Sequence, residues 1–170
     1  MNLCHHVDLV RNLAGLKAES VVAIMGNLKG LSEVEDHATL NIHYAGGAVG
    51  SFSGSISVPG LRHESVSIWG RDGSLELGLE FGQDSRIYTR QFTDALQPRC
   101  WIPLRLRPRL LARAIFFGRF ADAVSNGRPP DVTAQDGLAV QAVLEAAYRA
   151  AETGRAVRPA DLVKCGSSNA

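Results

Sequence analysis

Cysteine is scarce in this sequence, and long hydrophobic runs are missing. The three cysteines, Cys4, Cys100 and Cys165, are too few and too scattered for a disulfide framework, and no Cys-x-x-Cys pair indicates a zinc site. This cysteine usage favours a reducing, cytoplasmic setting. The most apolar segment, residues 110–120, is interrupted by two arginines and is too short to span a membrane. No signal peptide is recognisable either.

A surplus of charge of one sign is also missing. The formal net charge is +1, which argues against a partner such as nucleic acid or an anionic membrane. Basic residues are concentrated only in the Arg-rich segment 99–113. This segment is interpreted either as a patch for a phosphate or an acidic partner, or as a solvated loop and helix start.

The length and composition are those of an ordinary globular domain. A chain of 170 residues with 45% hydrophobic residues can bury one sizeable core. We therefore expect a single domain over residues 1–165, followed by a disordered tail over residues 166–170.

The hydrophobic periodicity predicts a helix, then strands, then two further helices. Apolar residues at helical spacing predict a first helix over residues 2–14, ended by Gly15, and later helices over residues 110–125 and from the N-cap Thr133 to Thr153, ended by Gly154. Phe116, Phe117 and Phe120, in the second of these helices, are expected in the core. Alternating and β-branched stretches predict strands over residues 20–25, 37–44, 48–58, 63–69, 74–81 and 86–90. A loop is expected over residues 91–108. Because short turns join the strands, the fold class is α+β, with an open, mainly antiparallel β-sheet and helices packed on one face.

The first helix carries the most informative polar residues. At 100° per residue, His5, Asp8 and Asn12 lie on one face, opposite the apolar stripe, whereas His6 points toward the edge of the stripe. An imidazole can exchange protons near neutral pH, and a carboxylate one turn away can orient it. From the pattern alone, a merely solvated polar face explains these residues as well.

Two other patterns do not support a binding site. The adjacent residues Cys4, His5 and His6 project from a helix in different directions and cannot share one tetrahedral metal site, so no metal is expected. The glycine-rich stretch 46–50 lies between two strands, whereas a phosphate-binding loop leads into a helix. We therefore interpret it as a hairpin turn.

Four stretches, in this order and spacing, resemble the C-terminal domain of the Gfo/Idh/MocA oxidoreductase family. They are His5-His6-Val7-Asp8-Leu9-Val10-Arg11 with Leu13-Ala14-Gly15; Glu35-Asp36-His37-Ala38 through Gly46-Gly47-Ala48-Val49-Gly50; Val66-Ser67-Ile68-Trp69-Gly70 with Asp72-Gly73-Ser74-Leu75; and Phe120-Ala121-Asp122-Ala123 through Tyr148 to Thr153-Gly154-Arg155-Ala156-Val157.

The resemblance implies an enzyme that moves a hydride between NAD or NADP and a carbon bearing a hydroxyl, on a sugar, cyclitol or related polyol. It places His5 at the family's catalytic acid/base histidine, with Asn2, Asp8 and Asn12 as candidate substrate-binding residues. It also implies a homo-oligomer formed through the exposed sheet face.

Two departures from the family pattern shape the functional hypotheses. Met1 stands where the family often has an aspartate, which leaves Asn2 as the nearby polar residue. No strand–glycine loop–helix unit and no Glu-Lys-Pro segment of a Rossmann domain is present, so no cofactor-binding residue can be assigned. The sequence therefore predicts a substrate-binding and oligomerisation domain that is inactive alone and works with a nucleotide-binding part, such as a separate Rossmann-domain chain. The alternative is a non-catalytic assembly module or a truncated remnant of such an enzyme.

Overall fold

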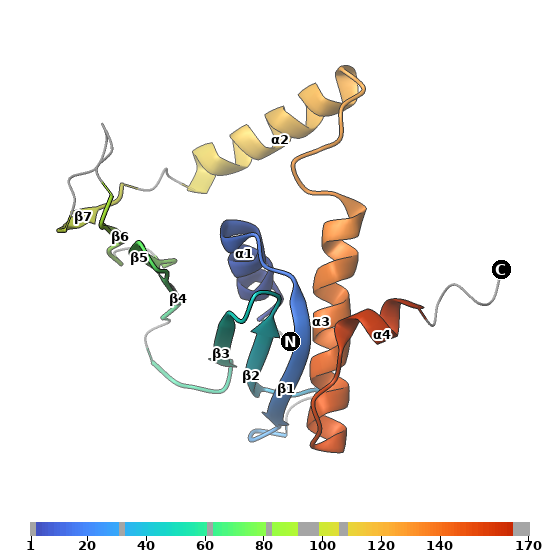
Figure 1. Ribbon diagram of the computed structural model, residues 1–170. Helices are drawn as coiled ribbons and strands as arrows, with labels where there is room; N and C mark the ends of the chain where they lie inside the picture. Colours follow the sequence, from blue (N-terminus) through green and yellow to red (C-terminus); the bar gives the residue numbers. More distant parts are fainter. Residues whose placement is uncertain are drawn as a thin grey trace. The chain divides into compact units, whose positions relative to one another are not determined.

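The computed structural model describes residues 3–30, 33–60, 63–80, 83–91, 99–105 and 109–164. Its elements, in chain order, are α1 (Cys4–Ala14), β1 (Ala18–Gly26), β2 (His37–Tyr44), β3 (Val49–Ser55), β4 (Ser65–Trp69), β5 (Gly73–Gly78), β6 (Arg86–Thr89), β7 (Trp101–Pro103), α2 (Arg109–Ser125), α3 (Ala134–Thr153) and α4 (Pro159–Lys164) (Figure 1). All strand pairs are antiparallel, which confirms the α+β class.

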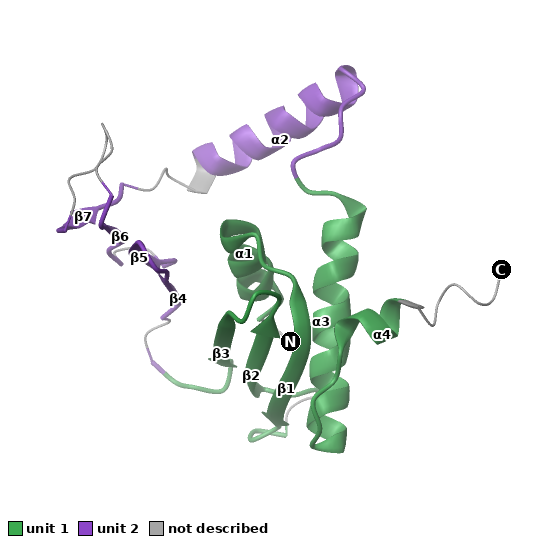
Figure 2. Cartoon of the chain, viewed as in Figure 1, with its two compact units in different colours: residues 1–59, 132–170 green, residues 60–131 purple. Residues whose placement is uncertain are grey.

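The chain divides into two compact units (Figure 2). The first comprises residues 1–59 and 132–170 and contains α1, the three-stranded sheet β1-β2-β3, α3 and α4. The second comprises residues 60–131 and contains the four-stranded sheet β4-β5-β6-β7 and α2. The expectation of a single domain over residues 1–165 stays a prediction.

The core of the first unit lies on one face of its sheet. In β2, buried and exposed residues alternate without interruption, so that Leu40 and Ile42 point inward while Asn41 and His43 point outward. The helices contribute Leu3, Val7, Val143, Ala146 and Ala147 to the same cluster. Small side chains on α3 allow its backbone to approach the sheet closely, and Figure 1 shows α3 running beside β1.

The outer edge of β1 is paired by the segment that follows α3. The N–H of Val21 donates to the carbonyl of Val157 at 2.9 Å, and the N–H of Val157 returns the bond at 2.9 Å. An unpaired edge strand invites association with other chains, so this bridge protects β1.

Two helices end at a glycine, and α3 begins with a capping box, as the sequence predicts. Gly15 and Gly154 have φ of 64° and 65°, in the left-handed region that favours glycine. Thr133 caps α3: its hydroxyl accepts from the backbone N–H of Asp136, while the Asp136 carboxylate accepts from the N–H of Thr133.

Two expectations from the sequence were wrong, and one element was not expected at all. Residues 101–103, expected in a loop, form β7, because a three-residue strand is too short to show periodicity. The short helix α4 was not expected. Phe116, Phe117 and Phe120 are exposed on α2 and not in a core, because an apolar pattern predicts a helix face but not what covers it. The expected tail over residues 166–170 lies outside the described residues.

Candidate functional site

The candidate site is the exposed side of α1. His5 and Asn12 are exposed, and Asp8 between them is partly buried. On the opposite side, Leu3 and Val7 are buried, which confirms the predicted orientation of the helix. An exposed imidazole on a helix of fixed orientation can take up or release a proton from a small molecule that contacts this face.

Core packing fixes α1 on the sheet. Val7 is 2% exposed and belongs to the cluster formed with Leu40 and Ile42. Strand β3 accommodates the start of the helix at Gly54, where an added Cβ would come within 2.9 Å of the Leu3 Cδ2 atom. His5 is therefore presented by a helix whose other face cannot move without opening the core.

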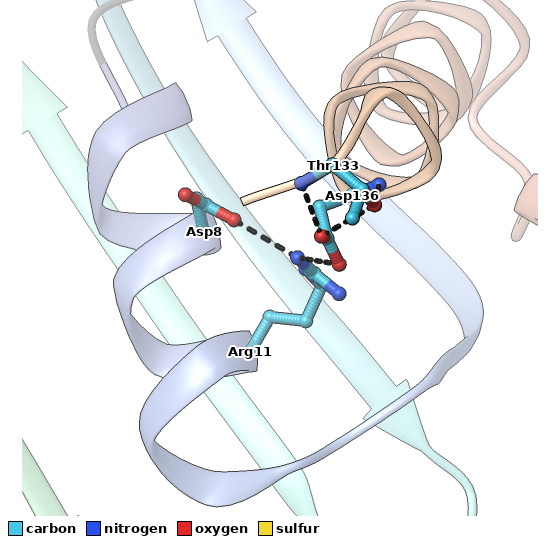
Figure 3. A network of polar contacts seen from close by, with 4 residues as sticks. All are labelled: Asp8, Arg11, Thr133 and Asp136. Carbon is cyan, nitrogen blue, oxygen red and sulfur yellow. Dashed lines mark hydrogen bonds and ion pairs between the residues drawn. The ribbon is translucent and has the colours of Figure 1, made fainter. Parts of the chain in front are cut away.

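Arg11 links the first helix to the start of α3 (Figure 3). Its Nη2 donates to the Asp136 carboxylate at 2.9 Å and to the Asp8 carboxylate at 3.2 Å. Asp136 also accepts from the backbone N–H of Thr133 at 2.8 Å and from its hydroxyl at 2.7 Å. The same carboxylate thus closes the capping box of α3 and anchors α1, although 125 residues separate Arg11 from Asp136.

The electrostatics of this network keep its groups charged. Hydrogen bonds from the backbone and the side chain of Thr133, followed by the bond from Arg11, lower the pKa of Asp136 to about 2. The bond to Asp136 is the largest cause that raises the pKa of Arg11, against an opposing effect of burial. The ion pair between Arg11 and Asp136, which braces α1 against α3, therefore remains charged across the neutral range.

The structure brings the predicted site residues onto one helix face but does not connect them as expected. Among the described residues, no hydrogen bond joins His5 to Asp8; Asp8 instead pairs with Arg11. The geometry therefore does not show Asp8 orienting the histidine; the Asp8 carboxylate instead holds Arg11, on the next turn of the same helix. Asn12 has its side chain in solvent, and Asn2 lies outside the described residues. Sequence reasoning did not identify the bridging role of Arg11, for which only the i,i+3 spacing from Asp8 was visible.

A second polar contact was also missed. The hydroxyl of Tyr148, on α3, lies 2.9 and 3.0 Å from the two carboxylate oxygens of Glu35, which precedes β2. Burial, together with this bond, raises the pKa of Tyr148 to about 12. The phenol therefore remains a hydrogen-bond donor, and the pair ties the β1–β2 connection to α3.

The glycine-rich stretch 46–50 does not form a dinucleotide-binding loop. Gly46 and Gly47 have φ of 82° and 85° and form the turn between β2 and β3, so this glycine-rich stretch is a hairpin and does not lead into a helix. Within the described ranges, no group of three His, Cys, Asp or Glu side chains could hold a metal ion. No helix in the same ranges is long and apolar enough to cross a membrane.

The Arg-rich segment 99–113 is described only in part. Arg99, Arg105 and Arg113 are exposed. Arg107 lies outside the described residues, and nothing assigns the segment a ligand.

Comparison with known proteins places the chain among oxidoreductases. The model of a family described as "Oxidoreductase family, C-terminal alpha/beta domain" matches residues 1–159. The crystal structure of GenD2 from gentamicin A biosynthesis, in complex with NAD, is 31% identical, with a TM-score of 0.69; the match covers 91% of this chain and 46% of that one. No curated protein sequence matches the chain.

Two further solved structures share the fold. One is the aldose-aldose oxidoreductase from Caulobacter crescentus complexed with glycerol, 24% identical with a TM-score of 0.73, covering 91% of this chain and 45% of that one. The other is the WlbA dehydrogenase from Bordetella pertussis with NADH and UDP-GlcNAcA, 23% identical with a TM-score of 0.69, covering 92% and 43%. The chain thus spans about half the length of the solved chains that it matches.

Proposed function

The chain belongs to the Gfo/Idh/MocA oxidoreductase family, whose C-terminal domain it matches over residues 1–159, and on this basis we propose that it is the substrate-binding and oligomerisation part of an NAD(P)-dependent enzyme acting on a CH–OH group of a sugar, cyclitol or related polyol. Because the family model spans both compact units, we also propose that residues 1–165 act as one domain.

The observation that carries the proposal is the placement of His5. Its imidazole is exposed on a helix that is packed on the core through Val7 and braced to α3 through Arg11. In this proposal His5 accepts the proton of the substrate hydroxyl when the alcohol is oxidised and returns it in the reverse reaction. Asp8 positions the helix through Arg11, and Asn12, one turn further, offers a hydrogen bond to another substrate hydroxyl.

The nicotinamide cofactor supplies the uptake or release of hydride when it is bound. The described residues lack a dinucleotide-binding loop, so we assign binding of the cofactor to a nucleotide-binding part outside them. That part is a Rossmann domain, either in the same protein or on a separate chain.

Complementation tests this proposal. The purified chain is mixed with the Rossmann domain of a related family enzyme, a panel of polyols and NAD or NADP, and nicotinamide absorbance is followed. We expect turnover in the mixture, none from the chain alone, and loss of turnover in His5→Ala. His63→Ala is the matched control, because His63 is an exposed histidine of the second unit and is on neither α1 nor the β1–β3 sheet. Equal rates for His5→Ala and the unmodified chain would contradict the catalytic role.

The oligomerisation part of the proposal is supported by the outer face of the β1–β3 sheet. Val22, Ile24 and Val49 are exposed there, beside the hydrogen-bonded pairs Asn41–Ser51 and Thr39–Ser53. We expect sedimentation velocity to detect an oligomer that Ile24→Glu weakens. Val58→Glu, at an equally exposed position outside the strands, is expected to leave it intact. A monomer at all concentrations would contradict this part of the proposal.

A further inference from the structure

The helix that presents His5 carries a single permanent positive charge, Arg11. It is the only lysine or arginine between Cys4 and Ala14. An arginine beside a sugar site can hold a carboxylate or a phosphate, because the planar guanidinium matches the paired oxygens of these groups. Whether Arg11 is open to such a group decides which charge of substrate this face accepts.

Arg11 is already paired inside the protein. Its Nη2 donates to Oδ1 of Asp136 at 2.9 Å and to Oδ1 of Asp8 at 3.2 Å (Figure 3). Its side chain is only 21% exposed, and its Nε atom is buried. An incoming anion would therefore have to displace one of the two carboxylates before it could bind the guanidinium.

The two carboxylates differ in what they leave open. Both oxygens of Asp136 are used, because Oδ1 accepts from Arg11 and Oδ2 accepts from the N–H and the hydroxyl of Thr133. Asp8 accepts through Oδ1, and no donor in the described part of the chain bonds to its Oδ2. Its side chain is also the more exposed, at 37% against 30% for Asp136. The Oδ2 atom of Asp8 is thus the acceptor that remains for a ligand.

Asp8 lies beside His5 on the helix surface. Residues three apart on a helix are neighbours, with about 5–6 Å between their Cβ atoms. A sugar whose hydroxyl contacts the His5 imidazole therefore brings the substituents of its adjacent carbons within reach of Asp8. A substituent that binds there has to donate a hydrogen bond, because a carboxylate only accepts.

The charges of the network do not cancel. Two carboxylates share one guanidinium, which leaves a surplus of one negative charge on the side of α1 that carries His5. The first turn of the helix adds a partial positive charge of about half a unit, which offsets the surplus only in part. The face is therefore negative where a substrate would lie.

We propose that Asp8 is a specificity-determining residue, which selects sugars with a hydroxyl or an ammonium group beside the reacting carbon and rejects sugar acids and sugar phosphates. The inference rests on the proposed function, because it takes the α1 face as part of the substrate site. A neutral sugar donates a hydroxyl to Asp8 Oδ2, and an amino sugar adds the attraction of its ammonium group. A carboxylate or phosphate at the same place meets a like charge and no open guanidinium.

The expected size of the effect follows from Coulomb's law. One unit of ligand charge about 6 Å from an unbalanced carboxylate in water changes the affinity by about threefold. An amino sugar gains this factor over the neutral sugar, and a sugar acid loses it. The two charged ligands should therefore differ in affinity by about tenfold.

Nuclear magnetic resonance of the full chain tests the inference without the cofactor. The amide shifts of α1 are followed while the ¹⁵N-labelled chain is titrated with glucosamine, glucose and glucuronate near pH 7 and at equal ionic strength. We expect the affinity to fall in that order. Asp8→Asn keeps an oxygen that can accept from Arg11 but removes the surplus charge, so it should shrink the difference between glucosamine and glucuronate to about twofold or less.

Asp161→Asn is the matched control variant, because it removes the same charge from an exposed aspartate on α4. It is expected to leave the order and the spacing of the three affinities unchanged. Glucuronate binding as tightly as glucosamine, no saturable shift with any of the three sugars, or equal effects of Asp8→Asn and Asp161→Asn would overturn the inference.

The complementation assay separates these outcomes from a failure of the proposed function. Turnover that favours a sugar acid over the matching amino sugar would overturn the inference and leave the proposed function intact. Full turnover by His5→Ala would instead contradict the proposed function, and the inference that rests on it would fall with it.

Discussion

Replacing Val7 by alanine tests how the helix that carries His5 is held. Val7 is 2% exposed and packs among the inward-facing residues of the sheet. The substitution removes two carbon atoms, which at about 0.8 kcal/mol per buried CH₂ costs about 1.6 kcal/mol of transfer free energy. Incomplete collapse around the cavity adds to this cost, so we expect the free energy of unfolding to fall by about 2 kcal/mol.

The assay is urea unfolding followed by far-UV circular dichroism, together with hydrogen exchange of the α1 amides. Leu13→Ala is the matched control, because Leu13 is on the same helix but 51% exposed, and it is expected to change stability by about 0.5 kcal/mol or less. Val7→Thr keeps the shape but buries a hydroxyl, and should cost at least as much as the alanine. Equal effects of Val7→Ala and Leu13→Ala would refute the packing of α1 on the core.

Three further outcomes are expected. Thr133→Ala removes the N-cap of α3 and should lower the free energy of unfolding by about 1 kcal/mol in urea melts, whereas an unchanged midpoint would show that the cap contributes nothing. Because the pKa of Asp136 is lowered from 3.8 to about 2, the stabilisation of the fold by its carboxylate is complete above pH 3.8 and is lost as the pH falls toward 2. Asp136→Asn should therefore flatten this part of the curve of unfolding free energy against pH. A variant curve that runs parallel to that of the unmodified chain would contradict the ion pair of Asp136 with Arg11. The phenolate absorbance of Tyr148 should titrate near pH 12. Glu35→Gln should bring the pKa of Tyr148 only part of the way back toward its ordinary value, because burial is the larger cause of the shift. An unchanged pKa in this variant would mean that Glu35 is not the partner of Tyr148 in solution.

Local signals in the sequence were sufficient for most elements. The strand over residues 37–44 was predicted with its observed bounds, because alternation on a sheet with one buried face is unambiguous. The helix ends at Gly15 and Gly154 were predicted for a similar reason, since left-handed φ values favour glycine. β7 and α4 were missed because elements this short contain less than one full period of either pattern.

The candidate site was predictable only in its one-dimensional part. Helical periodicity placed His5, Asp8 and Asn12 on one face, and the family pattern gave His5 its expected role. The partner of Asp8 was not predictable with certainty, because His5 and Arg11 are both three residues away from it and spacing alone favours neither. The structure selects Arg11, which is simultaneously drawn to Asp136.

The sequence by itself determined the α+β class, the family and the helix that presents His5, because these depend on local periodicity, on glycine at turns and helix ends, and on the order of short motifs. Only the tertiary structure decided that Arg11 joins α1 to the cap of α3, that Glu35 meets Tyr148, and that Trp69, Tyr88 and Trp101 share one face. These contacts join residues distant in sequence. Strand register and packing bring them together, and a linear pattern encodes neither.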